Sequence, residues 1–467
     1  MAALGIASAQ TTWDAGGAAD TNINTAANWN NDTLPANLGT AQVSFGSAGS
    51  VATFNVDYFL QGVTLNRGGV FELNSSGGNL VLRSANTSSV YGITMSSGAT
   101  VTQTINAPIR VSTNNADANK LLVVRNNNTT STRMLDINGD IRRSSDSSAD
   151  FQIRYEGVAG SVTRLDGAIS NVTNLQQTGN TWAGTLIVSG NRSLSNTNIS
   201  AATTGSGVGA ITGSLVLGEA ATEVQSWGNL TLNNGLKVVV GGDVTFAGFA
   251  GAATTSIVGA TQTGGAVSKL TFNVVSTTTI GSTITLGGAG AGENNLSLVK
   301  SGASSLTLSG TGTYTGATRV EAGTLRLGAA NRIADTSTLV LAGGTFDVNG
   351  FSETLGALDL DATGFLDLDD AANVTGSISF ANSSGSDWGS FGLSITASAL
   401  GAQGIRFGTD AFSLNAGQLA NITVNGQGGW TLDTQGYLTA IPEPSSFAVL
   451  AGSAALGAVA LRRRRRA

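Results

Sequence analysis

The chain has neither cysteine nor histidine. Without a thiol or an imidazole it can build neither a Ser-His-Asp nor a Cys-His catalytic relay, and the usual structural zinc and iron sites are excluded as well. Disulfide bonds are impossible, so the cysteine content does not tell an oxidising compartment from a reducing one. We therefore expect no cofactor, no metal centre and no catalytic residue of these types.

Proline and charged residues are scarce, and glycine is abundant. The 467 residues include 4 prolines and 64 glycines, and 11% of them are charged, whereas soluble proteins average about 5% proline, about 7% glycine and about 25% charged residues. Collagen is excluded because it needs glycine at every third position. Disorder is not expected either, since 41% of the residues are hydrophobic and the mean hydropathy is +0.13, which provides apolar surface to bury.

Basic residues are few outside one cluster. The net charge is −6, yet five of the 23 lysines and arginines form the run 462–466, so the rest of the chain is more acidic than the total suggests. Only four lysines are present, Lys120, Lys237, Lys269 and Lys300. A body of this charge lacks the basic face that phosphate backbones require, so we exclude nucleic acid as a partner.

The composition changes abruptly at residue 442. Pro442, Glu443 and Pro444 precede the uncharged residues 447–461, and five consecutive arginines follow. As a helix, residues 445–461 would extend about 25 Å, which is long enough for a thin bilayer. The arginines would stay on the cytoplasmic side, so the body would lie across the membrane from them. An ordinary amphipathic helix with a basic end is the alternative.

The order of these elements closely resembles the PEP-CTERM sorting signal of Gram-negative bacteria. The resemblance implies that an exosortase, a membrane transpeptidase-like protease, recognises residues 441–467 and cuts near the motif. It also implies sorting to the cell envelope, outer surface or exterior, with the export machinery and, at least transiently, the membrane as further partners. The implied sorting motif is Pro442, Glu443 and Pro444. The implied membrane-orienting residues are Arg462, Arg463, Arg464, Arg465 and Arg466.

The N-terminus resembles part of an export signal. Ala7, Ser8 and Ala9 before Gln10 look like a small-residue cleavage site, but residues 1–9 contain no lysine or arginine. A secretory signal peptide begins with a positively charged segment. We therefore expect residues 1–9 to be the remnant of a signal peptide whose true start codon lies upstream.

Between these ends, short runs of alternating apolar and polar residues are broken by Gly, Asn, Asp and Ser, which predicts strands and turns. Residues two apart on a strand share a face, so the leucines are expected to point inward and the residues between them outward. The uninterrupted apolar run 238–240 predicts a strand covered on both faces. No long helical pattern precedes residue 445. The clearest alternating runs are 80–82, 215–217, 230–232, 306–308, 324–327 and 339–341.

The spacing of these runs favours a coil of strands over a sandwich, because short strands recur at close intervals from Leu296 to Gly328. We predict an all-β fold, a right-handed parallel β-helix or β-solenoid, over residues 10–440, followed by a short C-terminal transmembrane sorting helix. Stacked rungs, each one circuit of the coil, would bury a continuous core of Leu, Val and Ile. Stacked Thr, Ser and Asn would form hydrogen-bonded ladders, which explains the low charge.

Residues 296–328 closely resemble the autotransporter-associated β-strand repeat. That repeat has a Lys-x-Gly turn, a Leu-Thr-Leu-Ser-Gly strand, a Tyr-Thr-Gly turn and a Val-x-x-Gly-Thr-Leu strand. A weaker copy, without the middle strand, lies at 175–188. The resemblance implies passenger-like architecture. The matching positions are Lys300, Gly302, 306–310, 314–316, Val320 and 323–325.

An acidic cluster between residues 359 and 370 is the strongest candidate for chemistry. Glycoside cleavage needs two carboxylates facing one bond, about 5 to 9.5 Å apart. Here leucines alternate with aspartates, so we expect the leucines to face inward and the aspartates to form a solvated outer face; a carbohydrate or Ca²⁺ site is the alternative. The aspartates are Asp359, Asp361, Asp367, Asp369 and Asp370.

Three further features point to structure. Residues 287–291 begin like a Ca²⁺-binding nonapeptide but lack its aspartate, which favours a flexible turn. Arg142 and Arg143, followed by serines, predict an exposed turn. The six tryptophans are dispersed, which favours packing over stacking on sugar rings.

Together these features predict an exported structural or adhesive protein of the cell surface or extracellular matrix, without enzymatic activity. Its polar ladders and loops are expected to contact extracellular polysaccharide, neighbouring cells or further copies of the chain. The alternative is a carbohydrate-active β-helix enzyme, a polysaccharide lyase or a glycosidase.

Overall fold

The computed structural model describes residues 11–13, 21–29, 34–36, 41–46, 51–66, 71–83, 91–112, 121–145, 149–176, 182–201, 212–232, 235–251, 254–372, 374–398 and 404–441. The chain divides into two compact units, Met1–Ser337 and Thr338–Ala467, called unit 1 and unit 2 below. The regular structure of both is almost entirely β-strand, as the sequence predicts.

Unit 1 is built from parallel sheets whose neighbouring strands are far apart in the sequence. The first sheet has the order β1 (Thr11–Trp13), β2 (Gln42–Phe45), β5 (Gly62–Leu65), β8 (Tyr91–Met95), β11 (Leu121–Asn126), β14 (Phe151–Gly157), β16 (Val172–Gln176), β19 (Asn198–Ala201), β21 (Val224–Leu232), β23 (Asp243–Gly251), β25 (Ser268–Asn273), β28 (Leu296–Ser301) and β31 (Thr318–Val320), with β18 (Arg192–Leu194) paired to β21. The second, 11-stranded sheet has the order β3 (Val51–Phe54), β6 (Phe71–Ser75), β9 (Gln103–Ile105), β12 (Met134–Ile137), β15 (Val162–Leu165), β17 (Thr185–Val188), β20 (Ser214–Leu217), β22 (Lys237–Val240), β24 (Thr255–Val258), β27 (Ile284–Leu286) and β30 (Thr311–Gly312). The shorter sheets are β4 (Tyr58–Leu60), β7 (Leu80–Arg83), β10 (Ile109–Ser112) and β13 (Ile141–Arg143), and then β26 (Thr278–Ile280), β29 (Ser305–Leu308) and β32 (Thr324–Leu327).

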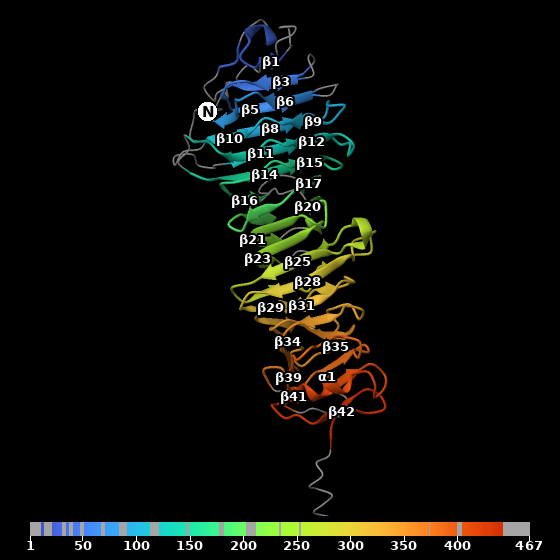
Figure 1. Ribbon diagram of the computed structural model, residues 1–467. Coiled ribbons are helices and arrows are strands. Elements are labelled where there is room, and N and C mark those ends of the chain that lie inside the picture. The colour runs from blue at the N-terminus through green and yellow to red at the C-terminus, as the bar shows by residue number, and fades with distance from the viewer. Residues whose placement is uncertain are drawn as a thin grey trace, which may run out of the picture. The chain divides into compact units, whose positions relative to one another are not determined.

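The chain of unit 1 passes from sheet to sheet and returns one rung further along. After β5 come β6 and β7 in two other sheets, and β8 then pairs in parallel with β5. Val63 lies opposite Ile93 in this pair, and Ile93 lies opposite Val124 in the next. Figure 1 shows β5, β8, β11 and β14 one beneath another. This coil of parallel strands has the architecture of a β-solenoid, because each crossover is the remainder of one rung.

Inward-facing residues of successive rungs stack into apolar columns. Val63, Ile93 and Val124 are all buried to 2% exposure or less. Leu306 and Leu308 of β29 are fully buried, while Thr307 between them is half-buried on the opposite face. The predicted alternation of leucine inside and polar residue outside is therefore confirmed on this strand.

Two strands depart from the expected covering of their faces. Val239 of β22 is only half-buried, so the prediction that both faces of residues 238–240 are covered is wrong. Val81 of β7, on the outer face, is in contrast only 1% exposed, with Phe59 and Arg110 as its register partners. Whether an outward residue is covered depends on the side chains of the neighbouring strands, and the alternating pattern of one strand does not show which side chains those are.

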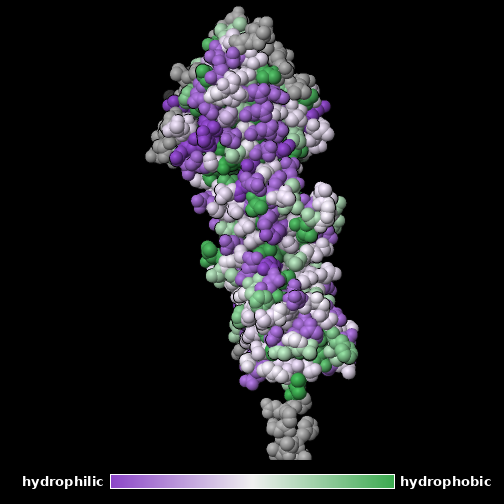
Figure 2. All heavy atoms as spheres, viewed as in Figure 1, coloured by the Kyte–Doolittle hydropathy of each residue, from purple (hydrophilic) through white to green (hydrophobic). Residues whose placement is uncertain are grey.

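A ladder of asparagines follows three successive rungs. Asn106 Nδ2 donates to Asn74 Oδ1 at 2.8 Å, and Asn138 Nδ2 donates to Asn106 Oδ1 at 3.0 Å. The members are spaced by 32 residues. The interior amide of Asn106 both donates and accepts, so the predicted polar ladder is confirmed here, and Asn74 Nδ2 at its end donates to the Glu72 carboxylate at 3.1 Å. Figure 2 shows many hydrophilic residues over the rungs around β8 to β14.

Unit 2 also consists mainly of short parallel strands. Its strands are β33 (Leu339–Leu341) paired with β36 (Leu358–Leu360); β34 (Thr345–Asp347), β37 (Gly364–Asp367), β39 (Leu393–Thr396) and β41 (Ile422–Val424); β35 (Ser352–Leu355), β38 (Ser377–Phe380) and β40 (Ile405–Phe407); and the antiparallel pair β42 (Trp430–Leu432) and β43 (Leu438–Ala440). Its single α-helix within the described ranges, α1 (Ala416–Ala420), begins with a capping box between Asn415 and Gln418. The described part of unit 1 has only the 3₁₀ turns η1 (Ala26–Asn28) and η3 (Thr263–Gly265).

Candidate functional site

The sorting residues predicted from the sequence lie outside the described part of the chain. This holds for Pro442, Glu443, Pro444 and residues 462–466, and for the signal remnant at 1–9. Within the ranges that the structure describes, no helix combines the length and the apolar character needed to cross a membrane. The sorting signal therefore stays a prediction.

The Lys-x-Gly turn of the 296–328 repeat is organised around a buried lysine. Lys300 of β28 is fully buried, and its Nζ donates to the backbone carbonyls of Ser301 at 2.9 Å, Gly302 at 2.8 Å and Ala322 at 2.9 Å. Burial lowers the pKa of Lys300 to about 8. Because Ala322 lies between β31 and β32, the lysine ties the turn after β28 to the turn one rung later. This motif residue is therefore structural.

The Tyr-Thr-Gly turn of the repeat is held by a buried chain of hydroxyl groups. The hydroxyls of Tyr314 and Thr318 are 2.7 Å apart, and those of Thr318 and Ser337 are 2.9 Å apart. Ser337 Oγ then donates to the carbonyl of Gly316 at 2.8 Å. All three hydroxyl side chains are fully buried. Such a chain satisfies each polar group and fixes the turn.

The tryptophans pack, as predicted, with one exception. Trp182, in the segment predicted to be a weaker copy of the repeat, is fully buried and packs edge-to-face against Tyr155 at 5.1 Å. Trp13 and Trp29 form a similar pair at 5.1 Å. Trp430 of β42 is partly exposed. Five of the six tryptophans are thus buried in the core, where they cannot stack on sugar rings.

The acidic cluster lies on the outer face of unit 2, as predicted. Leu358, Leu360, Leu366 and Leu368 are buried to 1% exposure or less, while the alternating aspartates are half-buried or exposed. Desolvation raises the pKa of Asp369, but hydrogen bonds from Thr375 and Ser398 outweigh it and bring the pKa below its ordinary value.

The carboxylates of this cluster are used in local turns. Asp370 Oδ1 accepts from the backbone N–H groups of Ala372 and Val374, each at 2.8 Å. Asp367 Oδ1 accepts from the N–H of Asp369 at 3.2 Å. A glycosidase acid needs a raised pKa, which Asp369 does not have. No cluster of three or more metal-ligating side chains occurs in the described ranges.

A polar hollow of about 330 Å³ opens on the sheet formed by β4, β7, β10 and β13. We call it the arginine hollow, and its lining residues are Asp57, Asn79, Arg110, Arg142, Arg143, Ser144, Ser145 and Asn171. Arg142 and Arg143 belong to β13, so the prediction of an exposed turn at these residues is wrong. Ile141 is buried and Arg142 exposed, which places them on opposite faces of the strand.

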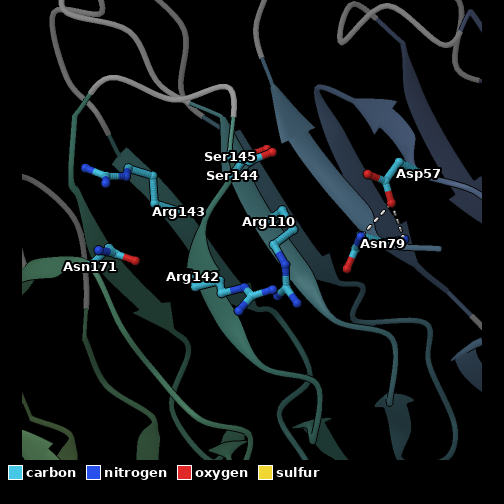
Figure 3. Close-up of a pocket in the computed structure, with 8 residues that line it drawn as sticks. All are labelled: Asp57, Asn79, Arg110, Arg142, Arg143, Ser144, Ser145 and Asn171. Carbon is cyan, nitrogen blue, oxygen red and sulfur yellow. Dashed lines mark hydrogen bonds between the residues drawn. The ribbon is translucent and has the colours of Figure 1, made fainter. Parts of the chain in front are cut away.

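Two cations face each other at the base of this hollow. Arg110 and Arg142 are register partners on adjacent parallel strands, and Figure 3 shows their guanidinium groups side by side, with Asp57 and Asn79 to one side and Arg143 to the other. Desolvation, followed by the charge of Arg142, lowers the pKa of Arg110, and these effects outweigh the nearby Asp140 and Asp57. Such a like-charge pair is unfavourable.

The sequence reasoning missed this hollow. The signal that could have found it is the 32-residue spacing of Asn74, Asn106 and Asn138, because Arg110 and Arg142 follow the same spacing. Aligning the chain at that interval would have stacked the two arginines, since they are register partners.

The family model of the passenger-associated-transport-repeat matches residues 298–327. No curated protein and no solved structure matches the chain. The matched segment is the rung held by Lys300 and the following strands up to β32. It confirms the autotransporter-associated repeat predicted from the sequence. Together with the parallel β-architecture it indicates a passenger-like β-helical protein of the exported or surface class.

Proposed function

We propose that this protein is an exported, right-handed β-solenoid that acts as a structural or adhesive component of the cell surface or extracellular matrix. The observation that carries the proposal is the passenger-type repeat, whose motif residues form one rung of a parallel stack. Right-handed crossovers are the rule for parallel strands, which supports the proposed hand. Apolar columns and an asparagine ladder join successive rungs of unit 1 and would make that unit rigid.

The proposed delivery route is the PEP-CTERM signal at 441–467. A Pro-Glu-Pro motif, an apolar segment and an arginine run are the features that an exosortase and the membrane would read. The exosortase, the export machinery and, transiently, the membrane are accordingly the proposed partners. The protein would then stay on the envelope or be released.

The proposed role is non-catalytic. The best acidic candidates use their carboxylates in turns, and this supports a role in display over glycoside cleavage. Purified protein incubated with extracellular polysaccharide is expected to release no new reducing ends. Steady release of oligosaccharides would overturn this part of the proposal.

The export proposal is tested by the accessibility of the protein in intact cells that contain an exosortase. Added protease is expected to digest the wild-type protein, and mass spectrometry is expected to show loss of the C-terminal segment. Glu443→Ala should accumulate as the uncut form, whereas Glu321→Ala, at an exposed glutamate of the body, should be processed normally. Wild-type protein that is protected inside intact cells would refute export.

A further inference from the structure

Arg110 is held in place at the base of the arginine hollow. It lies on β10 between Ile109 and Val111, which are fully buried, and is itself only 8% exposed. Its Nη1 donates to the backbone carbonyls of Ile109 and Asp140, both at 3.1 Å. Within the described residues, Nη2 and Nε have no protein acceptor. The guanidinium is therefore a fixed cation with unused donors.

Arg142 places a second cation beside it, and Asp140 and Asp57 compensate the two charges only in part and from a distance. Adjacent parallel strands are about 4.8 Å apart, and the two arginines are direct register partners. No carboxylate of the described chain lies within ion-pair distance of Arg110 or Arg142, whereas Arg143 is paired with Asp150 at 2.8 Å. An anion bound between Arg110 and Arg142 would relieve their repulsion and could accept from both planar groups.

The same hollow also holds an acceptor. Asp57 Oδ1 accepts from the backbone N–H of Asn79 at 3.0 Å and from Asn79 Nδ2 at 2.5 Å, which orients the exposed carboxylate. Its Oδ2 has no partner within the described part of the chain. A ligand that carries both a negative group and hydroxyl groups would use the arginines and Asp57 together, whereas the charge of Asp57 would repel a multiply charged phosphate.

The hollow continues along the rungs. A second polar hollow of about 270 Å³ shares Asn171 with it and is lined by Asp150, Ser170, Thr173 and residues 193–197. Asn171 therefore borders both, and the Arg143–Asp150 pair joins their walls. Together the two hollows have room for a ligand longer than one sugar ring. The first hollow offers the cations of Arg110 and Arg142, whereas the second offers mainly hydroxyl and amide groups.

We propose that the arginine hollow and its neighbour form a binding groove for an acidic polysaccharide, in which Arg110 and Arg142 bind the carboxylate of a uronic-acid unit and Asp57 accepts from a hydroxyl of that unit. The second hollow takes the adjoining sugar. The inference deepens the proposed extracellular role and rests on it for the source of the ligand. Binding itself is measured on the purified chain, so its failure would leave the export proposal intact, and a failure of export would leave the binding result intact.

The test is isothermal titration of the full-length protein with tetragalacturonate at low salt. The fully methyl-esterified tetramer keeps the hydroxyl groups but has no carboxylate, and it should bind at least about tenfold more weakly, because charge-assisted hydrogen bonds are the stronger ones. Arg142→Gln should weaken binding of the acid form by at least about tenfold. Arg326→Gln, at an exposed arginine of β32 outside the groove, should bind as the wild type.

Two further arms separate this ligand from other anions. Inorganic phosphate and a tetraglutamate peptide should each bind at least about tenfold more weakly than tetragalacturonate, since neither holds a carboxylate and sugar hydroxyl groups on one ring that could reach the arginines and Asp57 together. Asp57→Asn should weaken binding of the sugar acid while leaving the weak binding of phosphate equal or stronger. Equal affinity for the acid and its methyl ester, equal effects of Arg142→Gln and Arg326→Gln, or a peptide that binds as tightly as the sugar would overturn the proposal.

Discussion

Replacing Gly302 by alanine should destabilise the repeat rung strongly. Gly302 has a φ of +78°, and a Cβ at this position would lie 2.4 Å from the carbonyl oxygen of Val274 and 2.7 Å from Asn273 Oδ1. The left-handed conformation costs alanine about 1 to 2 kcal/mol, and a contact of this kind with packed backbone adds about 1 to 3 kcal/mol. We expect a loss of about 2 to 5 kcal/mol, measured by urea unfolding followed by far-ultraviolet circular dichroism.

Gly264→Ala is the matched control for this prediction. Gly264 has a φ of +71°, and its added Cβ would meet nothing within 4 Å, so only the conformational cost of about 1 to 2 kcal/mol applies. Hydrogen exchange should show the loss of protection of Gly302→Ala centred on residues 296–328 and their neighbouring rungs. If both variants lose the same free energy of unfolding, the contact between the added Cβ and the carbonyl of Val274 does not destabilise the chain, and the reasoning is refuted.

Three further predictions concern the same stack. Lys300 has a pKa of about 8 in the folded chain against 10.5 when unfolded, so between these pH values the unfolded state binds more protons and the free energy of unfolding should rise with pH by up to about 3 kcal/mol. Urea unfolding of Lys300→Met from pH 7 to 10 should lack this rise. Parallel pH profiles for the wild type and the variant would contradict the assigned pKa. Leu306→Ala should cost about 2 to 5 kcal/mol in the same assay, against about 0.5 kcal/mol or less for Thr307→Ala, and similar losses would mean that β29 is not oriented as described. Asn106→Ala should cost only about 1 kcal/mol because its ladder is exposed, and a loss as large as that of Leu306→Ala would show that the ladder, and not the apolar column, dominates.

The strand pattern was predictable because its cause is local. A strand with one buried face must alternate, and Leu306-Thr307-Leu308 shows that alternation both in the sequence and in the burial of its side chains. The acidic segment was predictable for the same reason, since Leu358 and Leu360 fix the outward direction of Asp359. Local periodicity therefore determined the face of each residue.

What lies beside each residue could not be predicted, because it depends on the length of the rungs. Val81 and Val239 are both outward valines between buried neighbours, yet Val81 is buried and Val239 is not. Arg110 and Arg142 become neighbours only through the register of β10 and β13. Lateral neighbours one rung apart are about 20 to 45 residues apart in solenoids, so short patterns within one strand carry no information about them.

In unit 1 the contacts that stabilise the stack differ from the arginine pair that is proposed to bind the ligand. Each rung of a solenoid is stabilised by its own packing and by its contacts with the next rung, and here apolar columns and an asparagine ladder supply such contacts. Arg110 also donates to the carbonyl of Asp140 in the next rung, but the juxtaposed charges of Arg110 and Arg142 oppose the stacking by about 0.2 to 1 kcal/mol. Arg142→Gln should therefore leave the urea midpoint unchanged or raise it slightly while it weakens the binding of a sugar acid, which is the pattern of a site kept for its ligand. A variant that lost both stability and binding would instead make Arg142 a structural residue of the rung, and the repulsion inferred from the register would be absent.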